Sequence, residues 1–202
     1  MIDREIPIKS VQSKEEVIKE WVLTPLIESY EIIKEEINTN TWENEITKKI
    51  ILGVKNKSSI SRIISKRSIR VFYRAKEVHD KDLTKEPDIT FVIGEDNILH
   101  QIDIEAKRIY ENGTVSDYCG KTGLCEFLSG NYSSNEDNGG MIAYIQEGCF
   151  SDIQKEIIAR VDSCNCIELI EDIGIDNSFL SRHERAIHRE IKIYHLLFDF
   201  VK

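Results

Sequence analysis

The chain has 202 residues, of which 41% are hydrophobic and 31% charged, and it contains only three prolines and ten glycines. This composition favours a globular protein of one domain over fibrous or low-complexity classes. No apolar run approaches the roughly 18 residues of a membrane-spanning helix, and the start MIDREIPIKS lacks the apolar core of a signal peptide. We therefore expect a cytoplasmic protein with no membrane partner.

Charge and cysteine content narrow the classes further. The net charge of −9 gives the molecule no general affinity for nucleic acid, because such affinity comes mainly from Lys and Arg. The segment from Lys55 to Lys76 departs from this average, since it is rich in Lys and Arg and has no acid. It indicates either a positively charged binding surface or an ordinary solvated face. Five cysteines at irregular spacing predict reduced thiols rather than a disulfide framework.

The first half of the chain predicts two helices and a strand. Apolar residues at helical spacing indicate a helix from Ser13 to Ile37, kinked or broken near Pro25 because proline lacks a backbone donor. A second helix is expected from Thr41, a candidate N-cap, to about Gly53. The alternating sequence SIRVFYRAKEV then predicts a strand, and HDKDLTKE a polar connection.

Two more strands, joined through the turn Gly94–Asn97, complete a three-stranded antiparallel meander. A short helix in SDYCGKTGLCEFLSG, a buried strand in GGMIAYIQEG and an amphipathic helix capped by Ser151 follow. The segments NCIELIEDIG and HREIKIYHLLFDF predict two last strands. This order indicates an α/β (α+β) protein with a mixed sheet and helices on its faces. We expect a single domain spanning residues 1–202.

The two strands of the central hairpin separate apolar from charged residues. Because side chains alternate along a strand, one face is expected to carry Ile89, Phe91, Ile93, Ile102, Ile104 and Ala106. The other face collects Asp88, Asp103, Glu105 and Lys107. A four-residue loop places Asp88 opposite Asp103, and a loop two residues longer places it opposite Glu105. In both registers the three acids share a face.

This row of charges points to a metal site. Like charges facing each other across strands are destabilising, and desolvated carboxylates cost more still unless a positive group lies between them. Oxygen-rich sites that leave positions to water suit Mg²⁺ or Mn²⁺. Lys107, two residues from Glu105 on the same face, is placed to orient an attacking water or to offset the charge of a phosphate. The alternative is an edge hairpin with charges on its exposed face.

Pro87-Asp88 followed by Glu105-Ala106-Lys107 resembles the PD-(D/E)XK nuclease superfamily, the restriction-endonuclease-like fold. The expected order of helix, three-strand meander, helix and strand in residues 41–146 is similar to the catalytic core of that family. Residues 1–40 would then be an N-terminal helical extension, and 147–202 a C-terminal helix and strands. The resemblance implies that the Asp and the Glu bind Mg²⁺ and that the Lys assists the attacking water.

The resemblance also implies a further acid from the preceding helix. Glu45 is the expected residue, as a metal ligand and catalytic group, with Glu43 the less favoured choice, since only one of the two is expected to face the sheet. The segment 123–148 resembles a pattern of restriction-endonuclease-like proteins from bacterial defence loci, in which a helix ending in Phe, Gly and Tyr leads to a Gly-Gly-Met-Ile strand. Glu126 stands where a basic residue is expected, which weakens the case for a DNA-backbone contact there.

These features predict a metal-dependent endonuclease acting on DNA, with a role in antiviral defence implied by the resemblance. A non-catalytic scaffold subunit of the same fold is the alternative, and cleavage of RNA stays open. Cutting both strands of a duplex calls for two active sites, so a homodimer or a partner motor or sensor protein is expected.

Other signals carry less weight. CGKTG lacks the first glycine of a phosphate-binding loop, because Val115 occupies that position. Cys164 and Cys166 are expected to be packed thiols rather than zinc ligands with His183 and His188. For His183 itself a solvated loop is favoured over a phosphate or partner contact.

Two further features are weighed in the same way. A second Glu-x-Lys, Glu190-Ile191-Lys192, has no Pro-Asp strand at hairpin distance before it. Trp21 and Trp42 are expected to pack in the core rather than to stack on bases.

Overall fold

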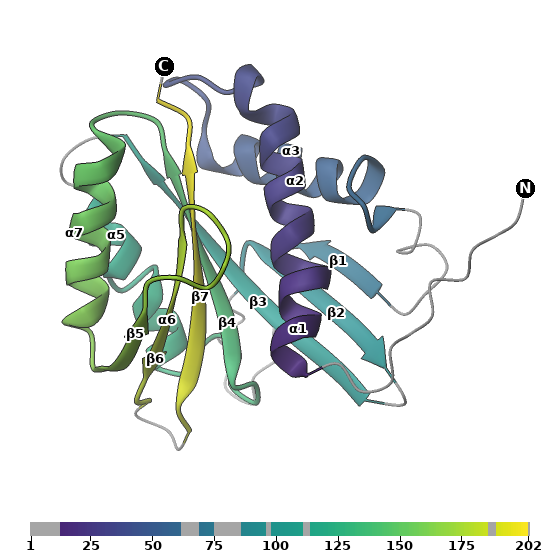
Figure 1. Cartoon of the computed structure of the whole chain (residues 1–202), viewed down its shortest axis with the longest axis vertical. Helices are drawn as coiled ribbons and strands as arrows, with labels where there is room; N and C mark the ends of the chain where they lie inside the picture. The colour runs from purple at the N-terminus through teal and green to yellow at the C-terminus, as the bar shows by residue number, and fades with distance from the viewer. Residues whose placement is uncertain are drawn as a thin grey trace, which may run out of the picture.

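The computed structural model describes residues 13–61, 69–74, 86–95, 98–110, 114–185 and 189–201. A seven-stranded mixed sheet runs through the molecule in the order β1-β2-β3-β4-β7-β6-β5 (Figure 1). The strands are β1 (Ile69–Tyr73), β2 (Ile89–Glu95), β3 (Ile98–Ile109), β4 (Asn138–Ile145), β5 (Cys166–Ile170), β6 (Ser178–His183) and β7 (Ile191–Asp199). The α-helices are α1 (Lys14–Ile18), α2 (Thr24–Ile33), α3 (Glu43–Asn56), α5 (Val115–Cys119), α6 (Leu124–Leu128) and α7 (Phe150–Asp162).

The sheet combines both pairing modes. Strands β1, β2 and β3 form the expected antiparallel meander, and β4 then pairs parallel to β3 after the crossover through α5 and α6. Strand β7 pairs parallel to β4, and β6 and β5 continue antiparallel to the far edge. The expectation of a mixed α/β sheet is confirmed, and the sheet is larger than the meander and strand that the sequence resemblance covers.

The N-terminal helix continues through Pro25 without breaking. A π-helical turn at Lys19–Leu23 joins α1 to α2, and a 3₁₀ turn at Lys34–Glu36 ends the helix. In the π turn the Thr24 N–H bonds to the Lys19 carbonyl. Its hydroxyl bonds to the same oxygen at 2.9 Å. This wider turn just before the proline is a place where a helix can accept a residue that lacks a donor.

Helix α3 starts one residue later than a Thr41 cap predicts. Its N-cap is Trp42, whose side chain makes no capping hydrogen bond, and the Thr41 hydroxyl instead accepts from the Asn38 N–H at 3.1 Å. The helix also runs past Gly53 and ends at Asn56. Gly53 allows α2 to approach closely. A Cβ at Gly53 would lie 2.0 Å from Ser29 Oγ.

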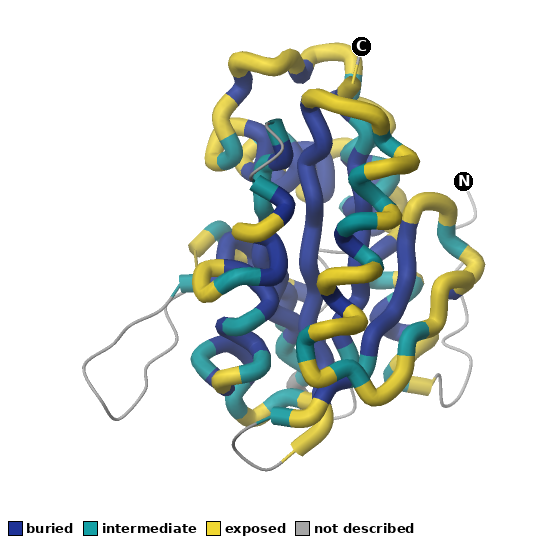
Figure 2. Tube along the Cα trace, turned by 90° about the vertical axis from the view of Figure 1, so that its left-hand side faces the viewer, coloured by how far each residue is buried: buried dark blue, intermediate teal, exposed yellow. Residues whose placement is uncertain are grey.

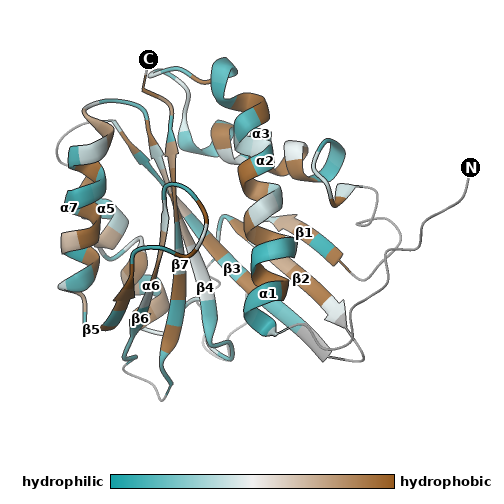
Figure 3. Ribbon diagram, in the orientation of Figure 1, coloured by the Kyte–Doolittle hydropathy of each residue, from teal (hydrophilic) through white to brown (hydrophobic). Residues whose placement is uncertain are grey.

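Two apolar cores lie on opposite faces of the sheet. Helices α1 to α3 pack on the face that carries Ile89, Phe91, Ile102 and Ile104, whereas α5 to α7 pack on the face of Met141 and other β4 and β7 residues. Figure 2 shows the strands as buried segments between helices that expose one side. Figure 3 shows that hydrophobic residues recur along the strands and along the helices. The expected apolar face of the hairpin is therefore confirmed, and α1 and α2 belong to the main core.

Three local predictions need correction. The expected single short helix is two helices, α5 and α6, separated by a glycine-containing turn. The Ser151 cap is wrong, because α7 begins at Phe150 with Cys149 as its N-cap. Strand β6 was not predicted at all, since its sequence SFLSRH contains polar residues that are usual in loops.

Several predictions lie outside the described residues: the tip of the central turn at 96–97, the polar connection at 79–85, His188, and positions 62–68 and 75–76 of the basic segment. In the part of the chain that the structure describes, the helices are too short or too polar to span a bilayer.

Candidate active site

The strand register brings Asp88 beside Glu105. Strands β2 and β3 pair with Ile89 opposite Ile104, so the next position outward sets Asp88 opposite Glu105. This is the second of the two registers considered, but the longer loop expected with it is wrong, because Gly94 and Glu95 of the predicted turn continue β2 and pair with Leu99 and Ile98. The Asp88 Oδ2 atom accepts a hydrogen bond from the Ala106 N–H at 3.1 Å, which fixes the carboxylate against β3.

The row of acids is buried. Asp88 and Glu105 each expose 5% of their surface, and Asp103 exposes none. Strand β3 lies inside the sheet between β2 and β4, with the short strand β1 as the edge. The alternative of charges on the exposed face of an edge hairpin is therefore wrong. Buried carboxylates need a partner, because removing a charge from water is costly.

Lys107 supplies one such partner. Its Nζ lies 2.6 Å from Glu105 Oε1, and the two side chains are 13% and 7% exposed. The other oxygen, Glu105 Oε2, is buried and accepts no hydrogen bond from the residues that the structure describes. Burial, together with the negative charge of Asp88, raises the pKa of Glu105 to about 8. Burial favours the neutral amine of Lys107, but the Glu105 carboxylate outweighs it and raises the pKa of Lys107.

The charged form of Asp88 is disfavoured, as that of Glu105 is. Burial raises its pKa, and the negative charge of Glu43 adds to this, against the opposing effect of the Ala106 N–H and of two cations. One of these cations is Arg74, whose Nε lies 3.8 Å from Asp88 Oδ1. The backbone N–H of Arg74 also donates to the backbone carbonyl of Asp88 at 3.1 Å. Arg74 belongs to the basic segment, so part of that segment reaches the acid cluster.

The helical acid that approaches the cluster is Glu43. Its Oε2 atom accepts from the Arg108 N–H at 2.8 Å, and its charge acts on Asp88, Glu105 and Lys107. Glu45, the residue favoured from the sequence, is exposed on the surface of α3. Side chains two residues apart in a helix are rotated by about 200°, so Glu43 and Glu45 point in nearly opposite directions.

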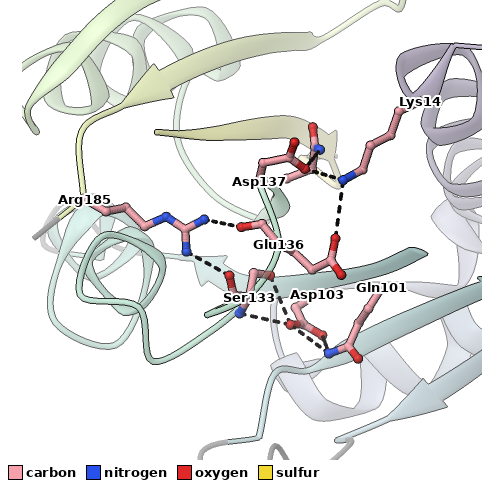
Figure 4. Close-up of polar contacts among 8 residues, drawn as sticks. Lys14, Gln101, Asp103, Ser133, Glu136, Asp137 and Arg185 are labelled. Carbon is pink, nitrogen blue, oxygen red and sulfur yellow. Dashed lines mark hydrogen bonds and ion pairs between the residues drawn. The ribbon is translucent and has the colours of Figure 1, made fainter. Parts of the chain in front are cut away.

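Asp103 lies on the same face but has a different role. Its carboxylate accepts from Thr90 Oγ1 at 2.9 Å. It also accepts from Gln101 Nε2 and from both the N–H and the hydroxyl of Ser133 at 3.1 Å (Figure 4). With its oxygens so occupied, it serves as an anchor for the segment before β4. Arg185 holds the same segment by donating to the carbonyls of Ser133 and Glu136 (Figure 4).

The anchored segment covers the acids. Tyr132, next to Ser133, is buried, and its hydroxyl donates to the Glu86 carbonyl at 3.3 Å. Burial and the charge of Glu105 raise the pKa of Tyr132. Ser133 could not be selected from the sequence, because it reaches the cluster from a segment distant along the chain, and Arg74 and Tyr132 were marked only as members of the basic segment and of the 123–148 pattern.

The donor set fits a hard divalent cation in part. Among the described residues, no three His, Cys, Asp or Glu side chains converge closely enough to enclose a metal ion. Mg²⁺, however, is commonly held by one or two carboxylates together with waters and substrate phosphates. Asp88 and Glu105 provide two buried carboxylates, and the unpartnered Glu105 Oε2 is an oxygen that a cation would satisfy.

The other sequence signals resolve into structural roles. All five cysteines are free. His183 is fully buried at the end of β6, where its Nδ1 lies 2.8 Å from the Cys164 carbonyl, so a solvated loop is wrong. In the second Glu-x-Lys, Glu190 pairs with Arg182 and Lys192 with Glu15 on the surface.

The two tryptophans differ. Trp21 packs against the main core, whereas Trp42 is 71% exposed, so its expected packing role is wrong.

The whole chain matches no model of a known protein family, no curated protein and no solved structure.

Proposed function

We propose that this protein is a metal-dependent phosphodiesterase that hydrolyses DNA, with Asp88 and Glu105 as metal ligands and Lys107 as the residue that positions the attacking water. The observation that carries the proposal is a pair of buried carboxylates at neighbouring strand positions, with one ammonium against them and one carboxylate oxygen unpartnered. Well-packed apolar residues would often stabilise these positions at least as well as a buried ion pair, so a role in binding or catalysis accounts better for the charges.

The order of elements supports a relation to the PD-(D/E)XK superfamily. A helix (α3), an antiparallel meander (β1–β3), a helical crossover and a strand (β4) parallel to the third follow one another as the resemblance implies. Asp88 precedes β2, and Glu105 and Lys107 lie on β3. Within this proposal the helical acid is Glu43 in place of Glu45.

The residues divide the work of hydrolysis as follows. The oxygen of a water bonds to phosphorus while the phosphorus–oxygen bond to the leaving nucleotide breaks, and the leaving oxygen takes up a proton. Bound Mg²⁺ or Mn²⁺ would polarise the phosphate and stabilise the charge that develops on it. Glu105 raises the pKa of Lys107, which favours its charged form, and the ammonium can donate hydrogen bonds to the water or the phosphate. Arg74 is placed to contact the nucleic-acid backbone.

The test is cleavage of supercoiled, linear and single-stranded DNA, and of an RNA of the same sequence, in Mg²⁺, Mn²⁺ or EDTA. We expect metal-dependent cleavage by the native protein and a loss of about 100-fold or more in Asp88→Asn and Lys107→Met, because both remove groups that act on the reacting atoms. Lys192→Met is the matched control, since it alters the lysine of the second Glu-x-Lys on the surface.

Equal cleavage by the native protein and both site variants would refute the assignment. A native protein that cuts none of these substrates in either metal would favour the scaffold alternative, in which the fold serves to hold a partner protein.

A further inference from the structure

Three side chains form a stack beside the acid cluster. The Arg108 guanidinium carbon lies 5.4 Å from the centre of the Trp42 ring and 4.2 Å from the centre of the Tyr110 ring. Trp42 is 71% exposed, more than any other large apolar side chain in the described ranges, while Arg108 and Tyr110 are half-buried. A tryptophan ring left this open to water gains little from packing, which suggests that the ring is used in binding.

The stack is held in place by a polar frame. Arg108 donates through Nε to Gln146 Oε1 and through Nη2 to the Thr39 carbonyl. Gln146 is itself buried and donates to the carbonyls of Asn38 and Thr41 at the start of α3. Among the described residues the acceptors of the guanidinium are thus neutral, and its positive charge is fixed in orientation without a carboxylate to cancel it.

The stack adjoins the candidate active site along both chain segments. Trp42 directly precedes Glu43, and Arg108 directly follows Lys107. The backbone N–H of Arg108 donates to Glu43 Oε2 at 2.8 Å, which ties the two segments together. Because side chains alternate along β3, Arg108 points to the sheet face opposite Lys107, and the two sites meet at Glu43, which binds the Arg108 backbone N–H and whose charge acts on the acid cluster. A nucleic-acid chain that places its phosphate at Asp88 and Lys107 and passes the β3 edge at Glu43 would bring an adjoining base to the rings.

We propose that Trp42, Arg108 and Tyr110 form a stacking site for an unpaired nucleobase next to the phosphate that is cut; this inference rests on the proposed function. Flat aromatic and guanidinium surfaces bind bases of any sequence through stacking. Bases within a duplex already stack on each other, so the site selects single-stranded or frayed nucleic acid. Trp, Tyr and Arg also anchor protein interfaces, but the position beside the acids favours a base here.

The test is the binding of a fluorescent single-stranded oligonucleotide and of its duplex, in Ca²⁺ and in EDTA, with the oligonucleotide checked for integrity afterwards. We expect tighter binding of the single strand, and a weakening of about 5- to 100-fold in Trp42→Ala. Trp42→Phe retains a ring and should keep most of the affinity. Leu52→Ala, at an apolar residue of α3 that is 57% exposed, is the control and should bind as the native protein does.

A second readout reports on the ring itself. The chain has two tryptophans, so Trp21→Phe leaves Trp42 as the only one, and its fluorescence, excited at a wavelength that tyrosine does not absorb, should be quenched as the oligonucleotide binds. Unchanged affinity in Trp42→Ala, or equal losses for duplex and single strand, would overturn the stacking site even if cleavage occurs.

Two further outcomes separate this inference from the proposed function. Binding that depends on Trp42 without any cleavage would support the stacking site and count against the phosphodiesterase. A native protein that binds no oligonucleotide would overturn the stacking site and leave the three side chains as a contact surface for another protein.

Discussion

At the scale of single residues, the site depends on charges that the fold holds in an unfavourable environment. Asp88 and Glu105 lie side by side in a buried position, and the pKa of each is raised, because burial disfavours the charged form and a nearby carboxylate adds to this, Glu43 for Asp88 and Asp88 for Glu105. Lys107 offsets one of the two charges. The arrangement costs folding free energy unless a cation is bound, which is typical of sites selected for function.

The two acids of α3 provide a sharp comparison. Glu43→Gln removes the charge that acts on the cluster and weakens the bond to the Arg108 N–H, so we expect cleavage to fall by about 10- to 100-fold. Glu45→Gln changes an exposed side chain two residues away and should leave the rate unchanged. Initial cleavage rates at saturating Mg²⁺ decide between them, and the reverse order of effects would restore Glu45 as the site residue.

Asp103 is expected to contribute to stability rather than chemistry. Asp103→Ala leaves the Ser133 N–H and hydroxyl and the Thr90 hydroxyl without their buried acceptor, which should lower the free energy of unfolding by about 3 kcal/mol. Thr90→Val removes only one of these donors and should cost about 1 kcal/mol. Urea denaturation measures both, and an unchanged midpoint in Asp103→Ala would show that the anchor is not needed.

Alternation along the strands allowed Asp88, Asp103, Glu105 and Lys107 to be placed on one face from the sequence. Their separate roles could not be predicted, because Ser133, which donates hydrogen bonds to the Asp103 carboxylate, comes from a segment thirty residues further along the chain. Glu43 was ranked below Glu45 because a helix start shifted by one or two residues rotates every side chain that follows.

At the scale of elements, α3 carries Glu43 to the sheet, and its contact with α2 fixes its position. Gly53 faces Ser29 of α2, whose hydroxyl bonds to the Ile50 carbonyl at 2.6 Å. The close approach explains why a glycine is kept in the interior of α3, where it lowers helix propensity.

Gly53→Ala tests this contact. Alanine favours a helix by about 1 kcal/mol, but its Cβ would lie 2.0 Å from Ser29 Oγ, so we expect a net loss of about 1–3 kcal/mol in unfolding free energy. Removing the clash in the double variant Ser29→Ala/Gly53→Ala should recover part of the loss. Thermal or urea unfolding provides the comparison, and a Gly53→Ala variant more stable than the native protein would mean that the helices can move apart.

The elements that were predicted well have an unambiguous pattern: α7 has helical periodicity, and β4 is a continuous apolar run after two glycines. Strand β6 escaped notice because its Ser181 and His183 are polar yet fully buried. Besides bonding to each other they bond to His195 on β7 and to the Cys164 carbonyl, and no pattern within SFLSRH reveals those partners.

At the scale of the whole molecule, a buried hydrogen-bond chain links α5 to the far edge of the sheet. The Tyr118 hydroxyl lies 2.8 Å from His195 Nδ1, and Ser181 Oγ lies 2.7 Å from both His195 Nε2 and His183 Nε2. Because the Cys164 carbonyl can only accept, His183 Nδ1 carries a proton, and the donors then run in one direction from Tyr118. All members are satisfied only while both histidines are neutral.

The buried hydrogen-bond chain predicts that the free energy of unfolding falls in acid. Burial lowers the pKa of His183 and, more strongly, that of His195. Below the unfolded pKa of about 6.5 the unfolded chain binds protons that the folded chain excludes, so stability falls as pH decreases. Between pH 7.5 and 5.5 we expect a loss of about 1–3 kcal/mol from the two histidines.

Asp88 and Glu105 act in the opposite sense, since their raised pKa values make the folded chain the better proton acceptor. The histidine contribution is therefore taken as the difference between the native protein and His183→Gln/His195→Gln, measured by urea unfolding at both pH values. The double variant should lose less stability on acidification, and equal losses would contradict the role of the chain.

The measurement that tests the central claim most directly is Mn²⁺ binding, followed by electron paramagnetic resonance of the free ion, because it does not depend on choosing the right substrate. The native protein and Lys192→Met should bind Mn²⁺, with Mg²⁺ competing, and Asp88→Asn should bind about tenfold more weakly or not at all. Equal Mn²⁺ binding by the native protein and Asp88→Asn, or none by either, would show that the buried acids are not a metal site.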